Sequence, residues 1–266
     1  MTSSIVQANC TRCGAEVHRS RALVADRPDW RQHVVCLDCR EAAEPAGTQV
    51  AQMIADRTRQ RWTDKAAAFD AGAHLENAHL DADPAAVWQQ RAHDALSTWR
   101  DPQLQRSRSG LMICGPTGIG KTWAAFAVAN AVADLGYGAE IRVASEAELM
   151  GPQVATWQLE DRFRRWIDGA VMVIVDDIGV APRHRDQLQA GWKMLVDLIS
   201  AQPRSMLVVG TSNRQSWGKE AGLTEWVGQQ TASRLRSWTS ICTTGAVDRR
   251  TGDTHENWER QTGRSQ

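Results

Sequence analysis

From about residue 71 onward, short apolar runs alternate with longer stretches in which apolar residues recur every three or four positions. The run VMVIV, residues 171–175, is continuous and rich in β-branched residues, as expected of a strand covered on both faces. Four further apolar runs predict strands at residues 111–114, 140–144, 206–210 and 240–244. Because helical stretches separate these runs, the pattern predicts a doubly wound, parallel, five-stranded α/β sheet.

The stretches between the strands carry helix signals. An Ala-rich helix is predicted over residues 121–136, where Gly136 provides the stop. Further helices are expected at residues 84–100, 159–168, 187–200 and 223–238. In the last of these, helical periodicity places four residues on one inward face, namely Val227, Thr231, Leu235 and Trp238.

Composition divides the chain into four parts. Residues 1–44 hold four of the six cysteines, and the Ala/Gln/Arg-rich residues 45–70 predict a helical linker. The α/β domain is expected over 71–245, and residues 246–266 form a polar tail without apolar periodicity. Such a tail cannot supply a helical lid, so we expect a sheet without a full lid.

Charge and hydropathy limit the class of protein. With 31 basic and 31 acidic residues the formal net charge is zero, so any contact with nucleic acid has to be a local patch. No apolar run approaches the roughly 20 residues that cross a bilayer, and the N-terminus lacks the features of a secretion signal. We therefore expect a soluble cytoplasmic protein with no membrane partner, in which cysteines are thiols or metal ligands.

The run GPTGIGKT fits the phosphate-binding pattern G-x-x-x-x-G-K-[ST] without a mismatch. It follows a predicted strand and opens a predicted helix, which is the context that the pattern requires. We expect Lys121 to reach the outer phosphates of ATP in a catalytic role, and Thr122 to hold Mg²⁺. The expected ATP-binding residues are Gly115, Pro116, Thr117, Gly118, Ile119, Gly120, Lys121, Thr122 and Asp176.

Polar residues follow two of the predicted strands. Asp176 and Asp177 come directly after residues 171–175, and Asn213 follows the strand at 206–210. Ligands bind at the carboxyl ends of strands in open α/β folds, so these side chains should lie beside the phosphates. We expect Asp176 to hold Mg²⁺ through a water, Asp177 to orient or deprotonate the attacking water, and Asn213 to hold that attacking water. The alternatives are carboxylates that only cap a strand exit and an asparagine that only forms a turn.

Two arginines flank the apolar face of the last predicted helix. Arg234 and Arg236 lie in TASRLRSW. An arginine here is either a solvated helix charge or an arginine finger that stabilises phosphoryl transfer on a neighbouring subunit. The spacing alone leaves both open.

The phosphate loop, VMVIVDDIG, TSN and SRL, in this order, resemble the AAA+ ATPases over roughly residues 71–245. Within that group the chain is similar to bacterial and phage helicase loaders of the DnaC/DnaI type and to transposition ATPases of the IstB type. The resemblance implies that Arg234 acts in trans, with self-association through the ATP sites, and that backbone near residues 72–99 lines the adenine pocket. Most AAA+ proteins have Glu where this chain has the shorter Asp177, which implies either slow hydrolysis or a switch dominated by ATP binding.

The resemblance also implies a contact with single-stranded DNA, through phosphate-binding arginines and base stacking on Trp157. The candidate arginines lie off the apolar face of the helix at 159–168 and are Arg162, Arg164 and Arg165. The alternative is a solvated helix face with Trp157 packed inside.

The motifs CTRC and CLDC form two C-x₂-C pairs separated by 22 residues. Four thiolates in two close pairs suit a structural, tetrahedral zinc ion, and a redox or disulfide pair is the alternative. The expected zinc ligands are Cys10, Cys13, Cys36 and Cys39. The DnaI-like loaders resemble this arrangement, which implies that the zinc module contacts the replicative helicase.

Together these features predict an ATPase that loads the hexameric replicative DNA helicase onto single-stranded DNA, with ATP, Mg²⁺ and Zn²⁺ as cofactors. Hydrolysis, expected to be slow and dependent on self-association, partner or DNA, would release the loader. Three alternatives stay open: an IstB-like regulator of transposition, a P-loop kinase for a small molecule, and a zinc adaptor whose ATP site is only structural.

Overall fold

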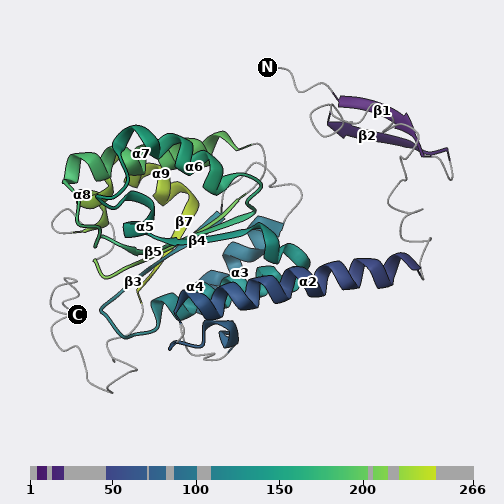
Figure 1. Ribbon diagram of the computed structural model, residues 1–266, viewed down its shortest axis with the longest axis horizontal. Coiled ribbons are helices and arrows are strands. Elements are labelled where there is room, and N and C mark those ends of the chain that lie inside the picture. Colours follow the sequence, from purple (N-terminus) through teal and green to yellow (C-terminus); the bar gives the residue numbers. More distant parts are fainter. Residues whose placement is uncertain are drawn as a thin grey trace. The chain divides into compact units, whose positions relative to one another are not determined.

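The computed structural model describes residues 5–10, 14–20, 46–70, 72–81, 87–100, 109–202, 206–214 and 222–243. The chain forms two compact units, Met1–Asp56 and Arg57–Gln266. In the first unit, β1 (Ile5–Asn9) pairs antiparallel with β2 (Glu16–Ser20), and the two strands are purple in Figure 1.

The second unit is built on a five-stranded parallel sheet, as the apolar runs predict. Its strands are β3 (Ser109–Cys114), β4 (Ile141–Ser145), β5 (Met172–Ile178), β6 (Leu207–Ser212) and β7 (Thr239–Thr243). They are arranged in the order β4-β5-β6-β3-β7, and each neighbouring pair is parallel. This order places β6 between the strand that precedes the phosphate loop and the strand that carries the two aspartates near its end.

Helices cover both faces of this sheet (Figure 1). On one face lie α3 (Val87–Arg100), α4 (Lys121–Val132) and residues 57–69 of α2 (Ala46–Phe69). On the other face lie α5 (Glu146–Met150), α6 (Leu159–Ile167), α7 (Arg185–Ala201), α8 (Leu223–Val227) and α9 (Gln229–Trp238).

Each face has its own hydrophobic core, because successive side chains of a strand point to opposite faces. In β3, Leu111 and Ile113 belong to the core under α4, whereas Met112 and Cys114 belong to the core under α7. The continuous apolar runs are therefore explained by burial on both sides.

The helix predicted over residues 121–136 ends where expected, although its last turn is irregular. After α4 the chain continues as the π-helical turn η5 (Ala133–Tyr137), in which Gly136 has φ 90°. A left-handed backbone is favourable for glycine, which is why the stop falls there. The short 3₁₀ turn η6 (Gly138–Glu140) then leads into β4.

The prediction of one continuous helix over residues 223–238 is wrong. The helix is broken at Gly228, where φ is 87° and ψ is 148°, into α8 and α9. The predicted inward face is nevertheless confirmed, since its first three members are buried and Trp238 packs partly buried against the same core. Its periodicity persists because the break turns the chain without moving this face away from the core.

The second half of the predicted linker helix is part of the core of the second unit. Trp62 is buried, stacks on Phe126 with ring centroids 5.6 Å apart, and donates a hydrogen bond of 2.6 Å to Asn130 Oδ1. The Asn130 amide in turn donates to the carbonyl oxygens of Leu75 (3.0 Å) and Ala78 (2.8 Å). These contacts fix the 3₁₀ turn η3 (Leu75–Asn77) against α4. In the described part of the chain, no helix is long and apolar enough to span a membrane.

Candidate nucleotide-binding site

The phosphate-loop motif lies between the end of β3 and the start of α4, at the carboxyl edge of the sheet. Gly118 and Gly120 have φ values of 83° and 89°, which only glycine adopts at low cost. The loop is tied to the neighbouring strand, because Gly115 N–H donates to Ser212 O at 3.1 Å. The backbone N–H groups and the positive end of the α4 dipole form a site for anions here.

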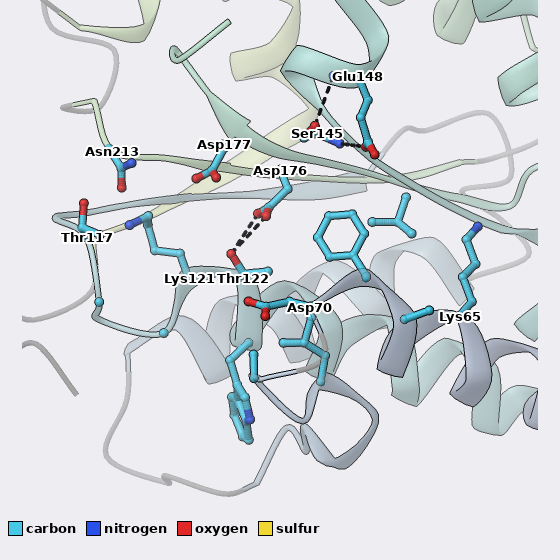
Figure 2. Close-up of a pocket in the computed structure, with 18 residues that line it drawn as sticks. Lys65, Asp70, Thr117, Lys121, Thr122, Ser145, Glu148, Asp176, Asp177 and Asn213 are labelled. Atoms are coloured by element: carbon cyan, nitrogen blue, oxygen red, sulfur yellow. Dashed lines mark hydrogen bonds between the residues drawn. The ribbon is translucent and has the colours of Figure 1, made fainter. Parts of the chain in front are cut away.

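A cavity of about 930 Å³ opens beside this loop (Figure 2). Among the residues that the sequence identifies, it is lined by Thr117, Gly118, Gly120, Lys121, Thr122, Asp176, Asp177 and Asn213. The structure therefore brings together the phosphate loop, the two aspartates and the asparagine, which are up to 96 positions apart in the chain.

Residues outside the motifs complete the cavity. They come from α2 and the segment that follows it, from η3, from the residue after Thr122, and from β4 and α5. They include Lys65, Phe69, Asp70, Ala73, Leu75, Trp123, Val143, Ser145 and Glu148. Ala73 and Leu75 fall in the segment where the resemblance implies the adenine pocket. The contribution of α2 is unexpected, because its sequence has the composition of a linker and no nucleotide-binding motif.

Lys121 is buried at the start of α4. Its Nζ donates to the carbonyl oxygen of Pro116 at 2.6 Å, so the ammonium group lies inside the curve of the loop. Figure 2 shows it directed toward the side of the cavity where Asp177 and Asn213 lie. A phosphate held by the loop would meet this charge.

Asp176 is a buried carboxylate at the end of β5. The Thr122 hydroxyl lies 3.1 Å from each of its oxygens, and the Thr211 hydroxyl donates to Oδ1 at 2.5 Å. Burial raises the pKa of Asp176, a shift that the Thr211 hydrogen bond opposes and the nearby Asp177 charge reinforces. Mg²⁺ is bound by oxygen atoms, commonly those of carboxylates. The Thr122 hydroxyl and the Asp176 carboxylate therefore fit this ion.

Replacing Asp176 with asparagine is expected to stabilise the nucleotide-free protein, with a melting-temperature rise of about 2–4 °C for each 1 kcal/mol gained. Because the folded-state pKa is raised, the folded protein keeps a proton that the unfolded chain has already released. The free energy of unfolding therefore falls as the pH rises from the ordinary value of 3.8 through the raised pKa. Asparagine removes this loss, and thermal unfolding measured against pH tests it.

The same variant should lose the extra stability that Mg²⁺ gives to the ATP-bound protein, because one of the two ligands is gone. At a pH below both pKa values the variant and the wild type should melt alike, which is the internal control. A variant that melts below the wild type at neutral pH, or that keeps the magnesium effect, would contradict this assignment.

Asp177 has a left-handed backbone with φ 54°, which is uncommon for a residue other than glycine. It lies in a register shift between Val175 and Ile178, opposite β6. Its N–H donates to Thr211 Oγ1 at 3.0 Å, and the following carbonyl, Ile178 O, accepts from Ser212 Oγ at 2.6 Å. This bulge directs the Asp177 side chain toward the cavity (Figure 2).

The left-handed backbone at Asp177 gives a physical reason for an aspartate at this position, where most AAA+ proteins have a glutamate. Aspartate tolerates the left-handed region better than glutamate, because its short side chain can bond locally. Asn213, just after β6, faces the cavity on the same side as Asp177 (Figure 2).

Arg234 does not line this cavity. It lies on α9, where its side chain is 52% exposed and forms an ion pair with Asp197 of α7. Lys193 pairs with the same carboxylate at 2.8 Å. Arg236, two positions on, instead donates to Thr224 Oγ1 at 3.1 Å.

The three arginines of α6 are exposed and each makes a contact within the chain. Arg162 donates to Glu148 O at 2.8 Å, Arg164 pairs with Glu160 at 2.6 Å, and Arg165 donates to Asp161 O at 3.2 Å. Trp157, in the 3₁₀ turn η7 (Thr156–Gln158), is 80% exposed. The alternative in which Trp157 packs inside is therefore wrong. A cavity of about 380 Å³ beside it is also lined by Arg162 and Arg165.

One of the four predicted zinc ligands lies in the described part of the chain. Cys10 is buried at the end of β1, its N–H donates to Ala15 O at 2.7 Å, and its carbonyl accepts from Gly14 N–H at 2.9 Å. Gly14 has φ 77°, a left-handed backbone that is favourable for glycine. Cys13, Cys36 and Cys39 lie outside the described residues. Within the described ranges, no group of three or more His, Cys, Asp or Glu could hold a metal ion.

The family model of the IstB-like ATP binding protein matches residues 48–226, about two thirds of the chain. No curated protein matches the chain. Among solved structures, a DnaC helicase loader is similar at 18% identity and TM-score 0.43, over 65% of this chain and 99% of that one. A structure of DnaI is similar at 16% identity and TM-score 0.44, over 66% of this chain and 92% of that one.

DnaA from Aquifex aeolicus bound to AMPPCP gives 15% identity and TM-score 0.46, over 66% of this chain and 52% of that one. The chain thus spans about half the length of that DnaA structure. Similarities at these TM-scores carry no functional assignment.

Proposed function

We propose that this chain, which belongs to the AAA+ family of IstB-like ATP-binding proteins, hydrolyses ATP to load the hexameric replicative DNA helicase onto single-stranded DNA. The observation that carries the ATPase part is the single cavity in which the phosphate loop, Asp176, Asp177 and Asn213 converge. The loader part rests on the predicted zinc module ahead of the AAA+ unit.

In this proposal the loop 115–120 and Lys121 bind the phosphates of ATP. Thr122 and Asp176 would hold Mg²⁺, which supplies positive charge against the phosphates when bound. Asp177 accepts a proton from, or orients, the attacking water, and Asn213 holds that water near the terminal phosphate. The short Asp177 side chain is consistent with slow turnover.

Arg234 is proposed to complete the site of a neighbouring protomer. Its position on α9, outside the cavity of its own chain, supports a role in trans. Because the Asp197 carboxylate holds the guanidinium, self-association has to exchange this ion pair for contact with the neighbour's phosphates. Hydrolysis then depends on self-association.

The remaining contacts are proposed for the partners. Cys10, Cys13, Cys36 and Cys39 would hold Zn²⁺ in a module that contacts the helicase. The backbone hydrogen bonds that join Cys10 to Gly14 and Ala15 support this. Arg162, Arg164 and Arg165 would contact DNA phosphates, beside a base stacked on the exposed Trp157. These arginine side chains stay exposed although each makes a bond within the chain. The ion pair with Glu160 partly neutralises the positive charge that Arg164 offers to a phosphate.

One experiment tests the loader proposal, namely retention of the purified replicative helicase by the immobilised full chain, with and without non-hydrolysable ATP. We expect nucleotide to increase retention by the wild type and not by Lys121→Ala. Cys36→Ser should lose about one zinc ion per chain and release the helicase while still binding ATP. Equal retention with and without nucleotide would overturn the proposal.

The family match keeps an IstB-like regulator of transposition as the alternative function. It would bind duplex DNA and a transposase, so preference for duplex over single-stranded oligonucleotides in the same assay supports it. A small-molecule kinase would instead release ADP only when an acceptor is added.

A further inference from the structure

Glu146, the first residue of α5, is a fully buried carboxylate with no role in the mechanism above. Its Oε2 accepts the backbone N–H groups of Gly179 (2.9 Å) and Ala181 (3.1 Å). Its Oε1 accepts the indole N–H groups of Trp192 (2.6 Å) and Trp226 (2.8 Å). A buried glutamate is rare, and this one joins three separate segments: the loop after β5, α7 and α8.

All four partners of Glu146 are donors, so the site requires two oxygen acceptors. A glutamine would offer one oxygen and turn its NH₂ group toward two N–H donors. An unmade hydrogen bond to a buried donor is costly. The chemistry of the site therefore selects a carboxylate and excludes the isosteric amide.

Arg214 lies on the other side of the same loop. Its Nε and Nη2 donate to Gly179 O at 3.2 and 3.1 Å, and its guanidinium carbon is 4.0 Å from the centre of the Trp226 ring. Burial lowers the pKa of Arg214, and the charge of Glu146 opposes this shift. Gly179 is thus held at its N–H by Glu146 and at its carbonyl by Arg214.

The loop leaves no space for another residue at this position. Gly179 has φ 102°, and a Cβ there would lie 2.5 Å from Arg214 Nε. Gly179 follows Asp177 by two positions, and Arg214 follows Asn213 directly. The contacts therefore tie together the two loops that carry the polar groups of the nucleotide cavity.

We infer that Glu146 and Arg214 form a positioning pair that holds Asp177 and Asn213 in place for ATP hydrolysis. Glu146 does not line the cavity, so it acts through the Gly179 peptide and through Trp226, on which Arg214 stacks. The expected effect of this pair on the hydrolysis rate rests on the proposed ATPase function. The physical coupling of the two loops can be measured without hydrolysis.

Glu146→Gln is expected to lower the single-turnover hydrolysis rate by about 10–100-fold, since a displacement of about 1 Å can cost that much. The affinity for ATP should stay close to that of the wild type, because no cavity residue changes. Glu160→Gln, an exposed substitution of the same kind on α6, is the matched control. A purely structural Glu146 would lower the melting temperature but not the rate per ATP-binding site.

Hydrogen exchange separates failure of this inference from failure of the ATPase proposal. Glu146→Gln should speed amide exchange in residues 206–214, which Glu146 reaches through Arg214. Unchanged exchange there overturns the positioning pair, whatever the hydrolysis rate of the wild type.

Should Glu146→Gln fail to fold, Arg214→Lys and Trp226→Phe replace it. Arg214→Lys loses the paired donation to Gly179 O, and Trp226→Phe keeps the ring while losing the bond to Glu146. Both should lower the hydrolysis rate, and their effects should be less than additive in the double variant, as for residues of one network. Full additivity would contradict the inference.

Discussion

Replacing Asp177 with asparagine is expected to slow ATP hydrolysis by about 10²–10⁴-fold, the range that a positioned general base contributes. Asparagine has the same size and adopts the left-handed backbone as readily, so the bulge and the bond from its N–H to Thr211 should persist. ATP affinity should therefore be retained. Single-turnover hydrolysis and equilibrium nucleotide binding measure the two quantities separately.

Two further variants make this result specific. Asp176→Asn should lose the magnesium-dependent part of ATP binding, which distinguishes the two neighbouring carboxylates. Asp177→Glu lengthens the side chain as in most AAA+ proteins but places glutamate at φ 54°, so it should fold less stably by about 1 kcal/mol. If Asp177→Asn hydrolyses ATP at the wild-type rate, Asp177 is not the group that orients the water.

Replacing Arg234 with alanine is expected to lower ATP hydrolysis by about 10³–10⁵-fold at concentrations where the protein self-associates, as loss of an arginine finger does. Nucleotide affinity should change little, because the guanidinium lies outside the cavity of its own chain. Mixing Arg234→Ala with Lys121→Ala should restore turnover. The first variant supplies an intact phosphate loop, and the second supplies the arginine beside it.

Arg236→Ala is the matched control, since Arg236 lies on the same helix and bonds to Thr224. Asp197→Asn, which removes the ion pair that holds Arg234, should ease transfer of the arginine to a neighbour and lower the concentration needed for activity. Wild-type turnover that is independent of protein concentration, with no restoration in the mixture, would rule out a shared site.

Much of the site could be predicted because its parts are short and local. The glycines of the phosphate loop, the aspartates after an apolar run and the asparagine after another are recognisable within a few residues. The cavity walls from α2 could not be predicted in this way. Trp62 packs on α4 through Phe126 and Asn130, which are 64 and 68 positions away, so composition alone assigns it to a linker.

The break at Gly228 is hidden in the sequence for a related reason. The apolar face from Val227 to Leu235 keeps helical periodicity across the break, so periodicity alone predicts one continuous helix. The glycine itself is the local signal of a break, since glycine is unfavourable within a helix, and in the structure it has φ 87°.

Local sequence patterns predict the strands, most helix ends and the phosphate loop, because backbone preference and side-chain periodicity act over a few neighbouring residues. The strand order depends on long-range packing, which sets β6 between β3 and β5 and so brings Asn213 beside Asp177. Long-range packing also brings Glu146 to indoles 46 and 80 positions away. Such contacts depend on how helices that are distant in the chain pack beside one another on the sheet, and no local pattern encodes them.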